Sequence, residues 1–251
     1  MYKRQDFEEF LIFKEIRIKV PKKGPISREV FDTVIRYYKE FIRFGGFPEV
    51  VLKASIPDKQ RALDEILTSY FQHEVIGFSD FRRNQIVRDL ILLLMERVGS
   101  PLDILRISRQ LGVSRQTVTN YLSFLEGSFL LHLIRPFSQS RDVEIRKRAK
   151  PYFCDTGLLN RFARIDEGRI LENRVLLDLL KRGEVNYYRR RSGVEIDFIL
   201  DRRFAYEVKI NPDTVDQNRI RRLSAELGLD GFTIVSLRYK KLDFISYPFQ
   251  L

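Results

Sequence analysis

Two apolar segments, residues 194–200 and 204–210, are separated by only three residues, and this spacing constrains the chain more than any other feature. Three residues are enough only for a hairpin loop, so the two segments are predicted to pair as antiparallel strands. Side chains alternate between the two faces of a strand. Glu207 and Lys209 are therefore expected on one face of the second strand, with Val208 on the other.

The hairpin places charged groups opposite one another. If its turn centres on Arg202, Asp197 lies directly across from Glu207. Two like charges at such a position repel, and the pair is costly unless a cation lies between them. Two carboxylates that converge on a hard divalent ion beside a lysine are the groups that metal-assisted phosphodiester cleavage uses. Asp197, Glu207 and Lys209 are therefore candidate catalytic residues.

The chain is strongly basic, with a net charge of +11 over 251 residues. A basic surface attracts polyanions, and nucleic acid is the most common of these, so DNA is the predicted partner. The alternative is a solvated basic surface without a partner. A hydrophobic content of 44% can supply real cores, so the chain is not expected to be disordered.

Cysteine and histidine are scarce, which limits the other classes of site. Cys154 alone cannot build a disulfide framework or a cysteine-rich zinc site, and His73 and His132 are too few to favour a histidine-based metal site. A reducing cytoplasm fits this usage. The longest apolar runs, such as residues 90–95, are too short to span a bilayer, and no signal-peptide pattern is present. Residues 1–5 resemble translated adapter sequence, which would place the natural N-terminus upstream.

Residues 1–98 are predicted to form a mostly helical region. Apolar residues recur at helical spacing over residues 28–43, and Ser27 precedes them as an N-cap. Residues 15–20 alternate like a strand. Helical spacing predicts two further helices, over residues 59–76 and 83–98.

Residues 99–140 have the pattern of a winged helix-turn-helix. A short helix over residues 103–110 leads into a glycine turn at 111–114, a second helix at 115–125 and a wing strand at 129–134. The polar face of the second helix is suited to contacts with bases or phosphates in a major groove, and consists of Arg115, Gln116, Thr119 and Asn120. The alternative is a winged helix that packs between domains or subunits.

Residues 141–251 are predicted to form an α/β domain with a mixed sheet, so the chain as a whole is expected to be α/β (α+β). A short strand and turn are expected at residues 151–157. The elements that follow are a helix at 168–182, strands at 184–190, 194–200 and 204–210, a helix at 214–227, and strands at 231–238 and 242–248.

Glu172 is a fourth candidate site residue. It shares a helix face with Val175, Leu176 and Leu179, the stripe expected to face the sheet. A carboxylate there is costly unless it is paired or binds a metal. In the alternative, Glu172 lies in the first helical turn, complements the helix dipole and stays hydrated.

Aromatic and basic residues border this predicted site. Arginines beside aromatic rings suit phosphate contact and base stacking, and the segment consists of Tyr187, Tyr188, Arg189, Arg190 and Arg191. The alternative is a strand whose tyrosines pack and whose arginines are solvated. Gln217 and Arg221 share a face of the following helix and give a weaker indication of phosphate contact.

The order of helix, three strands, helix and strand, with Asp197-x9-Glu207-x-Lys209 on the hairpin, resembles the PD-(D/E)XK nuclease core. The Pro-Asp pair of that motif is absent, because Ile196 precedes Asp197. A wider resemblance covers nearly all of residues 26–240. It is carried by the segments Arg43–Val51, Tyr152–Leu158, Leu171–Asn173 and Tyr188–Arg190, together with the hairpin.

These segments are similar to the prokaryotic, largely archaeal, AAA-type ATP-binding proteins with a winged helix and a nuclease-like domain of unknown function. That family normally starts with a P-loop ATPase domain, but this sequence has no Gly-x-x-x-x-Gly-Lys-[Ser/Thr]. No ATP site is therefore expected here, and the chain resembles the family's C-terminal part. The resemblance implies an ATPase domain or another copy of the chain as a partner.

The resemblance also implies roles for the candidate residues. Asp197 and Glu207 would bind Mg²⁺ or Mn²⁺ with the Val208 carbonyl, Lys209 would position water or stabilise phosphorane charge, and Glu172 would complete the shell or hold a second ion or water. The predicted function is a DNA-associated module with a metal-dependent nuclease site. The alternative is an inactive nuclease fold, with Lys209 in an internal salt bridge, that binds DNA, regulates or mediates oligomer contacts.

Overall fold

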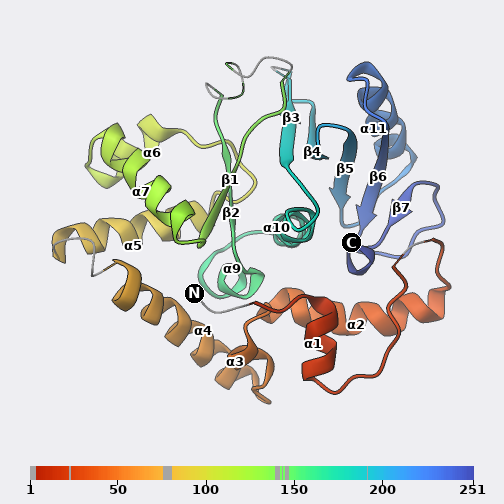
Figure 1. Ribbon diagram of the computed structural model, residues 1–251, viewed down its shortest axis with the longest axis horizontal. Helices are drawn as coiled ribbons and strands as arrows, with labels where there is room; N and C mark the ends of the chain where they lie inside the picture. Colours follow the sequence, from red (N-terminus) through yellow and green to blue (C-terminus); the bar gives the residue numbers. More distant parts are fainter. Residues whose placement is uncertain are drawn as a thin grey trace.

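The computed structural model describes residues 4–22, 24–75, 81–138, 142, 144, 147–190 and 192–251. Helices dominate the first half of the chain, and a mixed sheet forms most of the last third, so the predicted α+β class is confirmed (Figure 1). None of the helices in these ranges combines the length and the apolar composition needed to cross a membrane.

The N-terminal region is helical, as predicted. Its elements are α1 (Phe7–Phe13), α2 (Arg28–Phe44), α3 (Pro48–Val51), α4 (Ile56–Tyr70), the π-helical turn η1 (Phe71–Val75) and α5 (Phe81–Met95). Ser27 caps α2 by accepting a hydrogen bond from the Val30 N–H. The strand predicted at residues 15–20 is wrong. Glu15 has a φ of 57° and the Ile16 N–H bonds to the Leu11 carbonyl, so the chain reverses after α1, and the segment pairs with no strand in the described part of the chain.

The two helices and the strand predicted over residues 103–134 form as α6 (Ile104–Leu111), α7 (Arg115–Gly127) and β1 (Leu131–Ile134), and a further strand, β2 (Lys150–Phe153), follows. Gly112 makes the left-handed turn with a φ of 65°, and Ser114 caps α7. β2 pairs antiparallel with β1, with Leu131 opposite Phe153. The second strand of this ribbon thus comes from the segment that the sequence assigned to the C-terminal domain.

β2 also makes hydrogen bonds along its other edge. The Gly99 N–H donates to the Pro151 carbonyl over 3.1 Å. The Asn173 side chain imitates a neighbouring strand, because its Oδ1 accepts from the Phe153 N–H (2.7 Å) and its Nδ2 donates to the Phe153 carbonyl (2.8 Å). Asn173 is fully buried and lies on α10. These bonds fasten α10, and with it Glu172, to β2.

The main sheet has the order β3-β4-β5-β6-β7. β3 to β5 are antiparallel to one another, and β5, β6 and β7 are parallel. The C-terminal elements are α9 (Thr156–Phe162), α10 (Glu167–Leu179), β3 (Val185–Arg189), β4 (Glu195–Leu200), β5 (Phe204–Lys209), α11 (Thr214–Glu226), β6 (Gly231–Ser236), β7 (Ile245–Ser246) and a 3₁₀ turn, η3 (Pro248–Gln250). The sequence predicted all of these strands, but it did not predict α9.

The sheet is buried on both faces. On one face, Phe198, Tyr206 and Val208 belong to a core that includes α10. On the other face, Ala205 and Ile234 pack with α11 in a smaller core. Burial on both faces explains why the central strands are apolar on both sides, and it means that any charged side chain pointing from them is removed from water.

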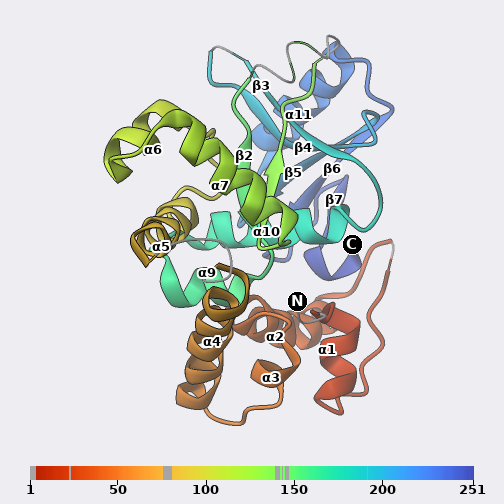
Figure 2. The ribbon, with the colours of Figure 1, turned by 60° about the vertical axis from the view of Figure 1, so that its left-hand side comes forward.

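A single large core joins the N-terminal helices to the C-terminal half. α9 contacts α2, α4 and α5, although it lies far from them in sequence. Figure 2 shows α9 between the N-terminal helices and α10. The predicted segments 1–98 and 141–251 therefore share buried surface.

Two glycine-containing segments meet at this junction. Asp155 is buried and accepts hydrogen bonds from the Gly46 N–H (2.8 Å) and the Gly157 N–H (2.7 Å). A Cβ atom on Gly45 would overlap the Asp155 carboxylate, and one on Gly157 would overlap the Phe44 carbonyl. The Gly45-Gly46-Phe47-Pro48 and Asp155-Thr156-Gly157 segments are thus two halves of one close contact that joins the end of α2 to the start of α9.

Candidate functional site

The β4–β5 hairpin has the predicted register. Its pairs, Phe198 with Tyr206 and Leu200 with Phe204, are centred on Arg202. Asp201 and Arg202 both have positive φ angles, 48° and 60°, as a tight turn of this kind requires. Asp197 and Glu207 therefore approach one another at the open end of the hairpin.

Asp197 and Glu207 are both buried, with 7% and 1% of their surfaces exposed. Oδ2 of Asp197 accepts a hydrogen bond from the Val208 N–H over 2.7 Å. Oε1 of Glu207 lies 3.0 Å from the Lys209 ammonium and accepts a hydrogen bond from Arg219, on α11. Lys209 and Arg219 thus offset the negative charge of Glu207, while Asp197 is held by a backbone N–H.

Glu172 lies in the same cluster, on α10. Its Oε1 accepts a hydrogen bond from the Tyr152 hydroxyl over 2.5 Å and lies 3.8 Å from the Lys150 ammonium. Only 16% of its side chain is exposed, so the hydrated alternative for Glu172 is not what the structure has. Lys150 and Tyr152 stand two residues apart on β2, and strand alternation turns both toward α10.

Burial and mutual repulsion raise the pKa values of the three carboxyl groups. Burial raises the pKa of Glu172 to about 8, and the charge of Asp197 contributes to this. Burial, again helped by Asp197, raises the pKa of Glu207 to about 7 against the opposing charges of Lys209 and Arg219. The pKa of Asp197 is also raised by burial, although Lys150 opposes the shift. Strongly perturbed carboxyl groups that converge from separate elements are typical of functional sites.

These shifts predict how stability depends on pH. A carboxyl group with a raised pKa holds its proton in the folded state over a range where the unfolded chain has lost it, so stability falls as pH rises through that range. For Glu172 the range runs from the ordinary 4.5 to about 8. The urea concentration at the unfolding midpoint, measured in EDTA, should therefore decrease as the pH is raised from about 5 to about 8. For the Glu172→Gln variant this midpoint should decrease less steeply over the same range. Equal slopes for the two proteins would contradict the prediction.

Three residues of the cluster were missed by sequence reasoning. Lys150 is fully buried on β2, Glu195 lies 3.5 Å from its ammonium, and Arg219 reaches Glu207 from α11. Glu195 lies two residues before Asp197, so strand alternation was a usable signal for it. Lys150 and Arg219 lie on other elements, β2 and α11. The sequence indicated Lys150 only weakly, as a charged residue at the start of an apolar strand.

The cluster has the chemistry of a site for a hard divalent ion. Oε2 of Glu207 is buried and, among the described residues, has no hydrogen-bond partner. Asp197, Glu207 and the Val208 carbonyl offer oxygen ligands, which Mg²⁺ and Mn²⁺ prefer, and Mg²⁺ usually keeps several waters. Within the described ranges, no three His, Cys, Asp or Glu side chains are placed to form a shell by themselves. The residues therefore fit an ion that relies on water or substrate for part of its coordination.

The polar face of α7 is exposed as predicted. Arg115, Gln116, Thr119 and Asn120 all lie on the surface, and Val118 is buried. Gln116 donates to Asn120 over 2.9 Å, which holds the two amides side by side. Figure 1 shows α6 and α7 on the far side of the β1–β2 ribbon from the main sheet. The structure thus keeps this surface apart from the carboxylate cluster.

The predicted basic residues near β3 have different surroundings. Arg189 lies 3.8 Å from Glu195, at the edge of the cluster. Arg190 pairs with Glu226 and donates to the Tyr188 hydroxyl, so it is directed toward α11. Arg191 lies outside the described residues.

Three further side chains that the sequence analysis named have partners within the fold. The Tyr187 hydroxyl donates to the Arg148 carbonyl over 2.5 Å. Gln217 is buried and donates to the Asp243 carbonyl, so its amide supports a loop. Arg221 is exposed and lies over the rings of Phe232 and Phe244.

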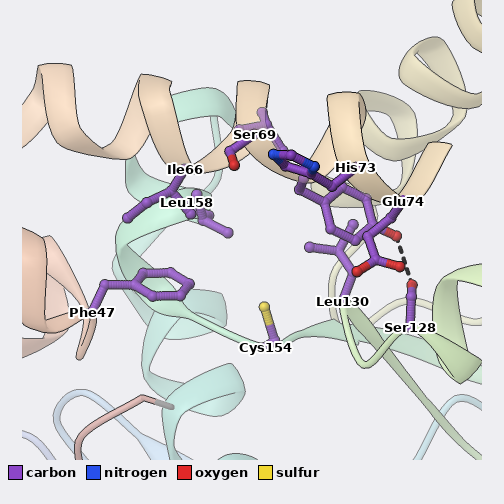
Figure 3. A pocket seen from close by; sticks show the side chains of 11 residues that line it. Phe47, Ile66, Ser69, His73, Glu74, Ser128, Leu130, Cys154 and Leu158 are labelled. Carbon is purple, nitrogen blue, oxygen red and sulfur yellow. Dashed lines mark hydrogen bonds between the residues drawn. The ribbon is translucent and has the colours of Figure 1, made fainter. Parts of the chain in front are cut away.

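A cavity of about 380 Å³ lies elsewhere, between α4, η1, α9 and the start of β1. Figure 3 shows Phe47, Ile66 and Leu158 on one side of it and Ser128 on the other. Tyr70 also lines the cavity, and its hydroxyl is hydrogen-bonded to Ser128. Cys154 lines it, and burial raises the pKa of this thiol to about 12, which keeps it protonated. No residue of the carboxylate cluster lines this cavity.

Residues 35–169 match a protein family described as a domain of unknown function, DUF8612. The chain belongs to this family. The match ends within α10, so it covers α6, α7 and Lys150 but not the β4–β5 hairpin. Membership in this family shows which proteins the chain is related to, but the family has no known function from which an activity could be taken.

The chain is also similar to uncharacterized proteins from distant organisms. One from Methanocaldococcus jannaschii is 28% identical over 257 residues, which cover 95% of this chain and 56% of that protein. One from Haemophilus influenzae is 30% identical over 175 residues (66% and 43%), and one from Mycobacterium tuberculosis is 23% identical over 209 residues (76% and 47%). The chain thus spans about half the length of the curated relatives it matches. The comparison with solved structures found no match.

Proposed function

We propose that this chain is a DNA-associated module with a divalent-metal-dependent phosphodiesterase site. The observation that carries the proposal is the buried Oε2 of Glu207, which has no hydrogen-bond partner among the residues that the structure describes and lies beside Asp197 and Lys209. A buried carboxylate oxygen without a partner is costly. A metal ion bound to this oxygen would remove the cost. Oxygen ligands for a divalent ion, with a lysine beside them, are suited to phosphodiester hydrolysis.

In this proposal each residue has a defined task. Asp197, Glu207 and the Val208 carbonyl hold Mg²⁺ or Mn²⁺, which when bound supplies an activated water and neutralises developing charge. Lys209 has 36% of its side chain exposed, so its ammonium can turn from Glu207 toward a phosphate oxygen. Glu172 keeps the far end of the cluster polar through Tyr152 and Lys150.

DNA would approach from the surface of α7 and from the edge of β3. The exposed Arg115, Gln116, Thr119 and Asn120 have the donors and acceptors that a helix presents to a major groove, as a winged helix does. Arg189 stands between the solvent and the cluster, where it can contact a phosphate. The net charge of +11 supports association with a polyanion.

The full-length context is part of the proposal. The matches cover 56% and 43% of the lengths of two relatives. The similarity to AAA-type ATP-binding proteins with a PD-(D/E)XK nuclease-like domain makes a P-loop ATPase the expected content of the remainder. This chain would then act in the cytoplasm beside that ATPase or another copy of itself.

A second candidate has its own observation in favour. Lys150, Lys209 and Arg219 already neutralise much of the carboxylate charge. A cluster held in this way can be structural, as many buried ion pairs are. In this case the chain binds DNA or a partner protein without cleaving DNA.

Cleavage assays separate the two candidates. Plasmid and single-stranded DNA are incubated with the purified chain in Mn²⁺, in Mg²⁺ or in EDTA. We expect cleavage in either metal and none in EDTA. Binding without cleavage in all three conditions, measured by fluorescence anisotropy on the same DNA, would reject the phosphodiesterase and favour the second candidate.

The α7 surface predicts a specific loss of DNA affinity. Arg115→Ala should weaken binding by about 1–3 kcal/mol if the arginine contacts a base edge, and should reduce the salt slope by about 1 if it contacts a phosphate. Arg61→Ala is the matched control, because Arg61 is an exposed arginine on α4, outside this surface. Anisotropy titrations at several salt concentrations measure both quantities. Equal affinities for the two variants would exclude α7 as the DNA-binding surface.

A further inference from the structure

A groove of about 840 Å³ lies beside β7, at the edge of the main sheet (Figure 1). No residue of the carboxylate cluster or of α7 lines it. One wall comes from the chain before α2, which is tied to the C-terminal segment. The Gln250 amide donates to the Gly24 carbonyl over 3.1 Å, and the Tyr239 hydroxyl donates to the Ile26 carbonyl over 3.3 Å. The groove is therefore built from segments far apart in sequence that hydrogen bonds hold together.

Aromatic rings form much of the lining of this groove. Six of its described residues are aromatic, contributed by β5, by β6 and by the chain that follows β6: Phe204, Tyr206, Phe232, Tyr239, Phe244 and Tyr247. Phe244 is the most exposed of them, with 52% of its surface accessible. Its ring centre lies 4.7 Å from that of Phe232. The groove thus presents flat apolar faces to the solvent.

The backbone fixes the exposed Phe244 ring in place. Phe244 has a φ of 60°, which is rare for a bulky residue. Its carbonyl accepts hydrogen bonds from the Ile234 N–H (2.8 Å) and the Thr233 hydroxyl (2.9 Å), so the pairing with β6 enforces this conformation. The Arg221 guanidinium lies 5.6 Å from the ring centre. Residues held in such conformations cluster at sites that clamp ligands.

Cations outnumber anions around these rings. The charged side chains of the described lining are Lys22, Arg182, Lys240, Lys241 and Asp243. Lys22 is paired with Glu8 over 3.1 Å, which leaves the other three cations as the main source of positive charge. The groove is therefore complementary to a ligand that combines negative charge with flat, unsaturated rings.

Single-stranded DNA has both of these properties. Its unpaired bases stack on aromatic side chains, and its phosphates are attracted to a basic groove. In a duplex the faces of the bases are covered by their neighbours in the stack, so rings that line a groove cannot reach them. An aromatic and basic groove thus favours a single strand over a duplex.

We propose that the groove beside β7 binds single-stranded DNA, with a base stacked on Phe244 and phosphates held by Lys240 and Lys241. The inference rests on the proposed function for the choice of DNA over RNA. It needs neither the carboxylate cluster nor the α7 surface. The groove is a binding site and takes no part in the cleavage chemistry.

The stacking contact is tested by substitution of Phe244. Fluorescence anisotropy in EDTA follows the binding of the full chain to a labelled DNA strand, to its duplex and to the RNA strand of the same sequence. The wild type should prefer the DNA strand to the RNA strand. Phe244→Ala should weaken single-strand binding by about 5- to 150-fold, with duplex affinity unchanged. Phe13→Ala is the matched control, because Phe13 is 46% exposed and does not line the groove.

The phosphate contacts are tested by the salt dependence of binding to the same DNA strand. Lys241 is exposed and lines the groove. Each phosphate contact on a single strand contributes about 0.7 to the slope of log affinity against log salt concentration, so Lys241→Gln should reduce the slope by about that amount. Lys53→Gln, at an exposed lysine after α3, should leave the slope unchanged.

The outcomes separate this inference from the proposed function. Wild-type single-strand affinity in a folded Phe244→Ala chain would overturn the inference, and so would an equal loss on the duplex or tighter binding of RNA. If Phe244→Ala does not fold by circular dichroism, an unchanged slope in Lys241→Gln overturns it. Groove-dependent binding without cleavage in Mn²⁺ supports the inference and rejects the phosphodiesterase alone. Cleavage without groove-dependent binding rejects the inference alone, and no binding to any nucleic acid rejects both.

Discussion

Replacing Asp197 with asparagine should lower the rate of metal-dependent DNA cleavage by at least about 100-fold, since weakening even the groups that support a metal ligand costs 10- to 100-fold. Asparagine has the same shape, and its carbonyl oxygen can still accept the hydrogen bond from the Val208 N–H. What it removes is the negative charge that faces Lys209 and the proposed ion. The loss should therefore appear in kcat and in Mn²⁺ affinity, with the fold retained.

Asp201→Asn is the matched control for this substitution. Asp201 lies on the same hairpin, is exposed, and accepts a hydrogen bond from the Glu184 N–H over 2.9 Å, which asparagine can also accept. Its cleavage rate should equal that of wild type. If Asp197→Asn cleaves DNA at the wild-type rate, the carboxylate cluster is not the catalytic site.

Asp197→Asn should also increase the stability of the metal-free chain. The charge of Asp197 contributes to the raised pKa values of Glu172 and Glu207, which reflect unfavourable burial of negative charge. Removing that charge relieves the repulsion. A higher thermal midpoint in EDTA combined with loss of cleavage is the pattern expected of a site whose residues are selected for function at a cost in stability.

Replacing Gly45 with alanine should destabilise the fold by about 3–5 kcal/mol, the range reached by severe core substitutions. Gly45 has φ 78° and ψ −172°, a region that only glycine occupies readily. Its Cβ would also overlap the buried carboxylate of Asp155, which is held by the Gly46 and Gly157 N–H groups. Urea denaturation monitored by circular dichroism measures the loss, and an insoluble product would agree with it.

Gly228→Ala separates backbone strain from steric overlap. Gly228 also has a positive φ, 66°, but a Cβ atom there would meet open space. Its cost should be limited to backbone strain, about 1–2 kcal/mol. Asp155→Ala in the Gly45→Ala background should recover part of the loss, because the overlapping group is gone. Equal costs at the two glycines would show that the contact with Asp155 does not determine the stability of this junction.

Local sequence patterns were sufficient to predict most of the helices and strands. The predicted capped helices at Ser27 and Ser114 form, and the β4–β5 hairpin has its predicted register, because caps, turns and alternation act over a few residues. The strand predicted at residues 15–20 failed because a strand needs a partner, and the turn at Glu15 leaves it without one. α9 was not predicted, because Gly157 gives a turn signal in the segment that Asp155 caps as a helix.

The site could be predicted in part. Asp197, Glu207 and Lys209 are neighbours on one hairpin, so spacing alone brings them together, and the apolar stripe of α10 placed Glu172 against the sheet. The bulge in the β3–β4 pairing, between Asn186 and Tyr188, was not predictable from alternation. The bulge interrupts the alternation of side chains along β4. Ile196 and Ile199 therefore point to the same face of the sheet and pack beneath α11.

The sequence by itself determined the hairpin, its register and three residues of the cluster, because these depend on spacing along one short stretch of chain. Only the tertiary structure decided which cations meet those carboxylates. Lys150 arrives from β2 and Arg219 from α11, and no periodicity relates either to the hairpin. Their positions follow from the packing of β2 and α11 around the sheet. The charge balance of a buried cluster is a property of that packing, since a side chain affects a buried carboxylate through distance in space rather than distance along the chain.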